Sequence, residues 1–237
     1  MLSLNLSKTN YMIMSSPGKR IKVDDCKIQI EGHDINRVES TTFLGVFFFI
    51  DDNMFWKLHI DNICNKVSKG IGILLRARQV LHSQTLLTLY NALIKPHFTY
   101  CISVWGNTYL KHMNKLHIMQ KKVIRIITNS DFLAHTAPLF DKHNIMNVYR
   151  LHVYFVGVFV FKAINGDLPK YLCNMFSRNL VSRNSINLRT FYCKKKFSQM
   201  SIRYNGPKIW NNFSNNCKCS KSVYIFKKWL KIECTKK

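Results

Sequence analysis

The pattern of apolar and polar positions changes near residue 54, where strand-like segments give way to a helical period. Upstream, segments 10–14 and 27–38 contain short β-like stretches, and Glu31-Gly32 interrupts the second of them as a turn. The run Phe43–Ile50, FLGVFFFI, is continuously apolar and rich in β-formers, which predicts a single strand buried on both faces. Asp51-Asp52 is expected to end it as a turn. The sequence therefore predicts a small antiparallel β portion at the N-terminus.

Downstream of residue 54, apolar residues recur at the spacing of amphipathic helices. Pro96 is expected to stop one helix, Asn165-Gly166 to end another, and Ser220 to cap the last. Segment 177–206 is polar and predicts a loop with one or two strands. The fold class is therefore mainly α with a small N-terminal antiparallel β portion. The predicted helices cover residues 56–74, 86–94, 97–105, 110–128, 149–164 and 220–231.

Charge narrows the class of partner. The chain has 36 Lys and Arg against 12 Asp and Glu, for a net charge of +24 over 237 residues. Such an excess repels itself unless a polyanion neutralises it, and nucleic acid is the commonest one, with a membrane surface second. Between Leu168 and Ile232 there are fourteen basic residues and no acidic one.

The predicted helix over 110–128 is divided lengthwise into a basic and an apolar half. Like charges one turn apart repel each other, and nucleic-acid phosphates would relieve that repulsion. The alternative is an ordinary solvated face. The apolar half carries Leu116, Met119, Val123, Ile124 and Ile127. The basic half, expected to be surface positions away from packing, carries Lys111, Lys115, Lys122 and Arg125, with Lys121 at its edge.

A second basic segment follows residue 177. There Lys194, Lys195 and Lys196 lie among aromatic residues, and this mixture suits single-stranded nucleic acid, with phosphate pairing and base stacking together. Some of those aromatic side chains must instead pack in the core.

The eight cysteines predict neither a disulfide framework nor a structural zinc. No pair has the C-x-x-C spacing, and Cys217-x-Cys219 is too tight. Reduced thiols used as small apolar residues favour an intracellular location, in nucleus or cytoplasm. The most apolar run, Val153–Val160, is far shorter than the ~20 residues of a spanning helix, and no secretory signal opens the chain. We therefore expect no membrane partner.

One short motif suggests polymerase chemistry. Phe49-Ile50-Asp51-Asp52 has the aromatic-x-Asp-Asp form of the turn that holds two divalent metals in polymerases copying RNA into DNA. Such a site also needs an Asp on an earlier strand, and only 50 residues lie upstream. A solvated turn, with one Asp capping the following helix, is the interpretation we favour.

Six segments, taken in order, resemble the C-terminal part of reverse transcriptases from jockey-like retrotransposons that lack long terminal repeats. The similarity that they carry extends over almost the whole chain in the family's order. The resemblance implies a palm remnant over 1–53, a helical thumb-like domain over 54–176 and a basic C-terminal extension over 177–237. The segments are LSLNLSKTNYMIM (2–14), FLGV (43–46), WKLHIDNICNKVSKGIGILLRAR (56–78), LLTLYNALIKPHFTYCISVWGN (86–107), KLHIMQKKVIRIITNS (115–130) and SIRYNGPKIWN (201–211).

The resemblance also implies a register. In the family, the N-x-x-K-T segment follows the catalytic turn, so the true metal-binding carboxylates would lie upstream of Met1 and Asp51-Asp52 is misplaced for that role. Lys8 matches the Lys that can protonate departing pyrophosphate. An exposed Lys near a strand start is its alternative interpretation. The segment that steadies the primer end in the family is matched by Phe43, Leu44, Gly45 and Val46. Apart from the glycine, these residues could equally belong to an ordinary core strand.

The resemblance therefore predicts part of an RNA-directed DNA polymerase that binds RNA and DNA as template and primer. It implies no cofactor in this part, although the complete enzyme would use two divalent metals, Mg²⁺ by expectation. Without the N-terminal part of the polymerase, the chain should catalyse nothing. The alternatives are an independent, non-catalytic helical RNA- or DNA-binding protein derived from such an element, and a gene-model fragment with no cellular role. An in-frame aromatic-x-Asp-Asp turn upstream of Met1 would favour the first interpretation.

Overall fold

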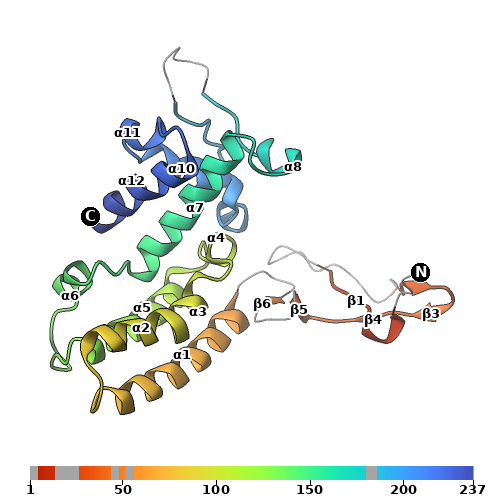
Figure 1. Ribbon diagram of the computed structural model, residues 1–237. Coiled ribbons are helices and arrows are strands. Elements are labelled where there is room, and N and C mark those ends of the chain that lie inside the picture. Colours follow the sequence, from red (N-terminus) through yellow and green to blue (C-terminus); the bar gives the residue numbers. More distant parts are fainter. Residues whose placement is uncertain (1–4, 14–26, 44–47, 52–55, 180–185, 237) are drawn as a thin grey trace. The chain divides into compact units, whose positions relative to one another are not determined.

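The computed structural model describes residues 5–13, 27–43, 48–51, 56–179 and 186–236 (Figure 1). The chain forms two compact units, Met1–Ile63 and Cys64–Lys237. Among the described residues, all strands lie in the first unit, and the second is helical apart from an isolated bridge between Arg178 and Leu188. The predicted fold class, mainly α with a small N-terminal β portion, is confirmed.

The first unit contains short paired strands. β2 (Gln29–Ile30) and β3 (His33–Asp34) form an antiparallel hairpin through Glu31 and Gly32, both at positive φ. Two such residues make the tight turn that suits the twist of a hairpin, as predicted. In contrast to the antiparallel expectation, β1 (Asn10–Tyr11) and β4 (Asn36–Arg37) pair in parallel. The hairpin lies between them in the sequence, so β4 can run in the same direction as β1.

The apolar run Phe43–Ile50 does not form the single strand that was predicted. β5 (Ser40–Phe43) and β6 (Phe48–Asp51) pair antiparallel, with Phe43 opposite Phe48 and Ser40 opposite Asp51. Strand β5 therefore includes the polar residues Ser40, Thr41 and Thr42 that precede the run, and of the run itself only Phe43 and Phe48–Ile50 lie in the described strands. Residues 44–47 and 52–55, which include Leu44, Gly45, Val46 and Asp52, lie outside the described residues.

Long and short helices alternate in the next part of the chain. The bounds are α1 (Lys57–Ala77), α2 (Ser83–Leu93), α3 (Lys95–Thr99), α4 (Ile102–Trp105), α5 (Leu110–Ile127) and α6 (Ala137–Lys142). Helix α2 ends before Pro96 as predicted, but Pro96 also lies in the first turn of α3, where a helix needs no proline N–H. The helix predicted over 97–105 is interrupted at Cys101, whose φ of 50° is left-handed and breaks the helical path.

Helix α7 (Val148–Ile164) is the element on which the second unit is organised. Asn147 caps it by accepting a hydrogen bond from the Arg150 N–H at 2.9 Å, and Gly166 at φ 79° ends it as predicted. A Cβ added at Gly157 would lie 2.8 Å from the Phe213 ring, so this glycine permits the close approach of the C-terminal segment. Helices α3, α4 and α5 pack against α7, as do the C-terminal helices.

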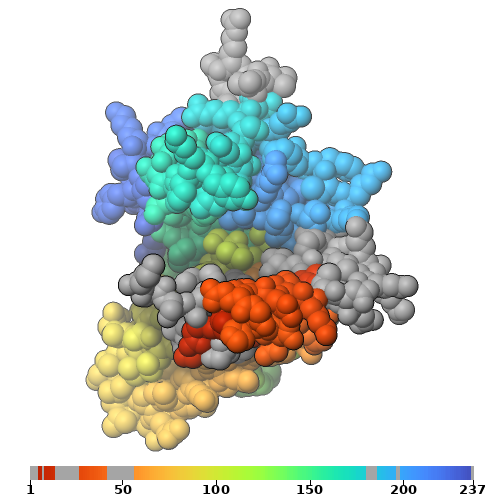
Figure 2. Space-filling model, turned by 90° about the vertical axis from the view of Figure 1, so that its right-hand side faces the viewer, coloured from red at the N-terminus to blue at the C-terminus, as the bar shows by residue number. Residues whose placement is uncertain are grey.

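The C-terminal helices are α8 (Lys170–Cys173), α9 (Lys196–Gln199), α10 (Ile202–Asn211), α11 (Asn215–Lys218) and α12 (Val223–Lys236). α10 and α12 pack on α7 around a buried aromatic cluster, in which the rings of Phe161 and Phe226 are 4.3 Å apart and Trp210 lies 5.8 Å from Phe226. In Figure 2 this C-terminal part, coloured teal to blue, forms one continuous body.

Two boundary predictions in this region were wrong. The last helix begins at Val223 rather than Ser220, because the Ser222 Oγ accepts the Ile225 N–H at 3.3 Å and caps it there. Segment 177–206, predicted as a loop with one or two strands, contains α9 and the beginning of α10. Helix α10 is stabilised there because its apolar face carries the buried Trp210.

Candidate nucleic-acid interface

The net positive charge of the chain belongs entirely to the second unit. Residues 64–237 contain 29 Lys and Arg against four Asp and Glu, whereas residues 1–63 contain seven and eight. A polyanion would therefore be attracted to the helical unit and hardly at all to the strands.

Helix α5 presents a basic row on its outer face. Lys111, Lys115 and Lys122 are exposed, and the Lys111 Nζ lies 5.9 Å from the centre of the Tyr109 ring. Lys121, at the edge of the row, is half-buried. The opposite face packs as the sequence predicts, with Met119 half-buried and with Leu116, Val123, Ile124 and Ile127 buried.

Arg125 is not the free surface position that the sequence predicts. Its Nε donates a hydrogen bond to the Ala134 carbonyl at 3.0 Å, and its side chain is half-buried. The helical wheel places it correctly but cannot show that a loop folds back onto it. Arg125 therefore has a structural role besides any contact with a ligand.

The loop after α5 is fixed at the helix end. Asn129 adopts a left-handed φ of 51°, and the Ser130 N–H donates back to the Arg125 carbonyl at 3.0 Å. This is the hydrogen-bond pattern of a helix ended by a left-handed residue. The hydroxyls of Thr128 and Ser130 are also 2.7 Å apart. Together with the Arg125 contact, these bonds hold the segment that carries Phe132.

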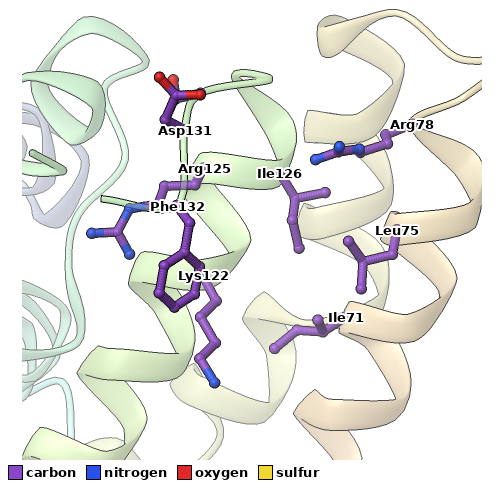
Figure 3. Close-up of a pocket in the computed structure, with 9 residues that line it drawn as sticks. Ile71, Leu75, Arg78, Lys122, Arg125, Ile126, Asp131 and Phe132 are labelled. Carbon is purple, nitrogen blue, oxygen red and sulfur yellow. The ribbon is translucent and has the colours of Figure 1, made fainter. Parts of the chain in front are cut away.

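A pocket of about 410 Å³ lies between α1 and α5, beneath this loop (Figure 3). Ile71 and Leu75 on α1 face Ile126 on α5, and Phe132 lies beside Lys122 and Arg125. Phe132 and Arg78 were not among the predicted site residues, although an aromatic residue shortly after a basic helix is a usable signal. The lining residues are Ile71, Leu75, Arg78, Lys122, Arg125, Ile126, Ser130, Asp131 and Phe132.

The second predicted basic segment is only partly available to a ligand. Lys194 and Lys195 are exposed, while the side chain of Lys196 lies outside the described residues. The Arg203 guanidinium lies over the Phe191 ring at 4.9 Å, so this pair is satisfied within the chain. Tyr192 is 86% exposed and offers a face for stacking.

Lys218, in the same basic stretch, is buried and serves the fold. Its Nζ donates to the Asn187 Oδ1 at 2.9 Å and to the Asn211 carbonyl at 3.0 Å. Burial lowers the pKa of this amine, and the Glu233 carboxylate acts in the opposite direction. Lys218 thus ties the segment around Leu188 to α10 and is not a candidate phosphate contact.

The remaining predicted positions lie in the first unit. Lys8 is exposed at the end of a short 3₁₀ helix, η1 (Leu6–Lys8), and Phe43 ends β5 beside the undescribed residues of the predicted primer-steadying segment. Within the described ranges, no three His, Cys, Asp or Glu residues are grouped so that they could hold a metal ion. In the same ranges no helix has the length and apolar character needed to cross a membrane.

Comparison with known proteins supports the predicted resemblance. The chain is 22% identical over 125 residues to the probable RNA-directed DNA polymerase from transposon X-element of Drosophila melanogaster, covering 52% of this chain and 14% of that protein. It is 25% identical over 121 residues to the RNA-directed DNA polymerase from mobile element jockey of Drosophila funebris, covering 49% of this chain and 13% of that protein.

No family profile matches the chain, and no solved structure matches it. The aligned part spans about one seventh of the length of these two relatives. Over about half of its own length, the chain is nevertheless related to the RNA-directed DNA polymerases of jockey-like retrotransposons.

Proposed function

We propose that this chain holds template and primer for a jockey-like reverse transcriptase and performs no chemistry by itself. The observation that carries the proposal is the confinement of the positive charge to the helical unit, where 29 basic residues face only four acidic ones. In this proposal residues 1–53 are the end of the palm, and the helices over 54–176 act as the thumb. The basic C-terminal extension, residues 177–237, adds further contacts to the same nucleic acid.

The lysine row on α5 is the proposed centre of phosphate binding. Lys111, Lys115 and Lys122 lie on one face of a helix that is anchored on its other face by buried Leu116 and Val123. Lys115 follows Lys111 by about one helical turn and Lys122 lies about two turns further along the same face, so the three ammonium groups can approach backbone phosphates from one side. Each neutralised phosphate releases condensed counterions. Such contacts position nucleic acid without reading its sequence.

In this proposal, Asp51 and Asp52 do not supply the metal-binding carboxylates that catalysis requires. By the register that the resemblance implies, LNLSKT at 4–9 follows the metal-binding turn, and Asp51 ends strand β6 after the primer-steadying segment. Two-metal displacement at phosphorus needs carboxylates converging from neighbouring strands. Asp51 pairs across the hairpin with Ser40, which cannot supply the second carboxylate.

The first prediction is that the purified chain does not extend a primer. With primed template, Mg²⁺ and nucleotides, no product should form above the level of a protein-free reaction, while a complete reverse transcriptase in the same buffer extends the primer fully. Extension that disappears in the Asp51→Asn variant would contradict the register and place a metal site at the end of β6.

The second prediction concerns salt dependence. Changing Lys111, Lys115 and Lys122 together to Gln should flatten the slope of log affinity against log salt by roughly 0.9 for each duplex phosphate that is no longer neutralised, or about 2.7 in all. Because all three side chains are exposed, the free energy of unfolding should change little. Arg125 stays unchanged in this variant, since its bond to Ala134 would confuse binding with folding.

A matched variant with Lys69, Lys142 and Lys170 changed to Gln is the control. It removes the same charge from exposed positions on α1, α6 and α8. Equal flattening by both variants would show that binding is spread over the whole unit. An unchanged slope in the α5 variant would make that helix an ordinary solvated one and credit binding to the stretch after Leu168.

A further inference from the structure

The pocket between α1 and α5 combines an apolar wall with a basic rim. Ile71 and Leu75 of α1 face Ile126 of α5 across it, as Figure 3 shows. Its volume of about 410 Å³ falls within the range of sites that hold small organic groups. All of its lining residues belong to the second unit.

Phe132 is an aromatic side chain held in place but not buried. Its ring is 76% exposed, although the loop that carries it is fixed by the left-handed turn at Asn129 and by the Arg125–Ala134 hydrogen bond. Exposing a ring on a fixed loop costs hydration free energy that folding does not recover. A planar, apolar partner that stacks on it would recover that free energy.

The charges around the ring select an anionic partner. Arg78 and Lys122 are exposed, and the Arg78 guanidinium reaches from the α1 side toward α5 in Figure 3. Asp131 also lines the pocket, but its carboxylate points away from the Phe132 ring. Three basic residues, Arg78, Lys122 and Arg125, thus line the pocket together with Phe132, and the single acid, Asp131, is directed elsewhere.

We propose that this pocket accepts one unpaired nucleotide, whose base stacks on Phe132 and whose phosphate lies between Arg78 and Lys122. The proposal rests on the proposed function and deepens it, because it adds a single-strand site beside the lysine row of α5. An acidic amphipathic peptide has the same two properties, apolar and anionic. The nucleotide is favoured because its flat base matches a single exposed ring, and stacking on an aromatic side chain accepts any base.

The experiment uses the whole chain and two DNA probes of equal charge. One is a flush duplex, and the other is a shorter duplex with a single-stranded overhang that carries 2-aminopurine, whose fluorescence is quenched by stacking. The unaltered chain should bind both and quench the overhang. The Phe132→Leu variant should bind the flush duplex as before, lose roughly 5- to 150-fold in affinity for the overhang and leave it bright.

Three further measurements make the outcome decisive. Phe132→Trp should restore both quenching and affinity, and Leu133→Ala, at an equally exposed neighbour, should change neither. Arg78→Gln should weaken overhang binding and reduce its salt dependence. Overhang binding and quenching unchanged in Phe132→Leu would overturn the inference while the proposed function stands.

Two other results would also overturn it. Failure of the unaltered chain to bind either probe would overturn this inference and the proposed function together. Competition for the pocket by an acidic amphipathic peptide, with no quenching of the overhang, would assign the pocket to a protein partner instead.

Discussion

Replacing Gln120 by leucine is expected to lower the free energy of unfolding by about 4 kcal/mol, a large share of the stability of a typical domain. Gln120 is 1% exposed and joins three elements. Its Nε2 donates to the Tyr90 hydroxyl on α2 and to the Met146 carbonyl, both at 3.0 Å, and its Oε1 accepts the Val148 N–H at 2.8 Å.

The expected destabilisation is large because leucine cannot satisfy any of these groups. Val148 is the first residue of α7, so its N–H has no partner within the helix. Tyr90 is buried, and burial raises the pKa of its phenol to about 12, so the hydroxyl remains neutral. Each buried polar group left without a partner costs about 1–3 kcal/mol.

Urea unfolding followed by circular dichroism measures this effect. Gln84→Leu is the matched control, because Gln84 is exposed in the first turn of α2 and its change should stay within about 0.5 kcal/mol. Tyr90→Phe should cost about 1 kcal/mol, since it removes one bond and leaves the other two intact. A destabilisation below about 1 kcal/mol for Gln120→Leu would show that the hydrogen bonds are not a structural link between α2, α5 and α7.

Gln120 also shows where the sequence pattern reaches its limit. The apolar period of the 110–128 segment predicts a helix, and α5 spans Leu110–Ile127 with Leu116 and Val123 buried as expected. A glutamine on the inner face does not fit the apolar pattern. It is accommodated there because its hydrogen-bond partners come from residues 26–30 positions away in the sequence. Helical periodicity reports which face is inward, whereas long-range hydrogen bonds depend on the packing of several elements.

The β portion was harder to predict for a related reason. An unbroken apolar run such as Phe43–Ile50 has no alternation, so nothing in it marks the place where the chain turns. The pairing of Ser40–Phe43 with Phe48–Asp51 is set by hydrogen bonds across the hairpin, and polar residues take part in it. Fold class was therefore predictable there, and strand bounds were not.

The candidate site divides in the same way. Exposure of Lys111, Lys115 and Lys122 follows from helical geometry, which the sequence determines. The bond from Arg125 to Ala134 and the burial of Lys218 depend on loops and on segments distant in the chain. A count of basic residues therefore overestimates the charge that is available to phosphates.

The second large expected effect is acid destabilisation of the helical unit through His152. Its imidazole packs on the backbone of Gly106, where an added Cβ would lie 2.3 Å from the ring, and its Nε2 is buried without a hydrogen-bond partner among the described residues. Burial lowers the pKa of His152 from 6.5 to about 4. The folded state thus prefers the neutral ring.

The sign follows from proton uptake. Well above pH 6.5 the ring of His152 is neutral in both the folded and the unfolded state, so His152 contributes no pH dependence to the free energy of unfolding. As pH falls from 6.5 to 4 the unfolded chain takes up the proton first, so the free energy of unfolding decreases, by about 3 kcal/mol at pH 4 from His152 alone. His117, packed against Phe140 and Tyr149, has its pKa lowered to about 4 by burial and by Lys121, and it acts in the same direction.

Urea unfolding at pH 7.5 and pH 4 tests this in His152→Phe, which keeps a ring over Gly106 and removes the titrating nitrogen. The free energy of unfolding of the variant should decrease by about 3 kcal/mol less than that of the unaltered chain between the two pH values. In the His135→Gln variant, changed at an exposed position, the free energy of unfolding should decrease between pH 7.5 and pH 4 as much as in the unaltered chain. If His152→Phe is also destabilised as much, the acid sensitivity arises elsewhere, from His117 or from repulsion among the basic residues of residues 64–237.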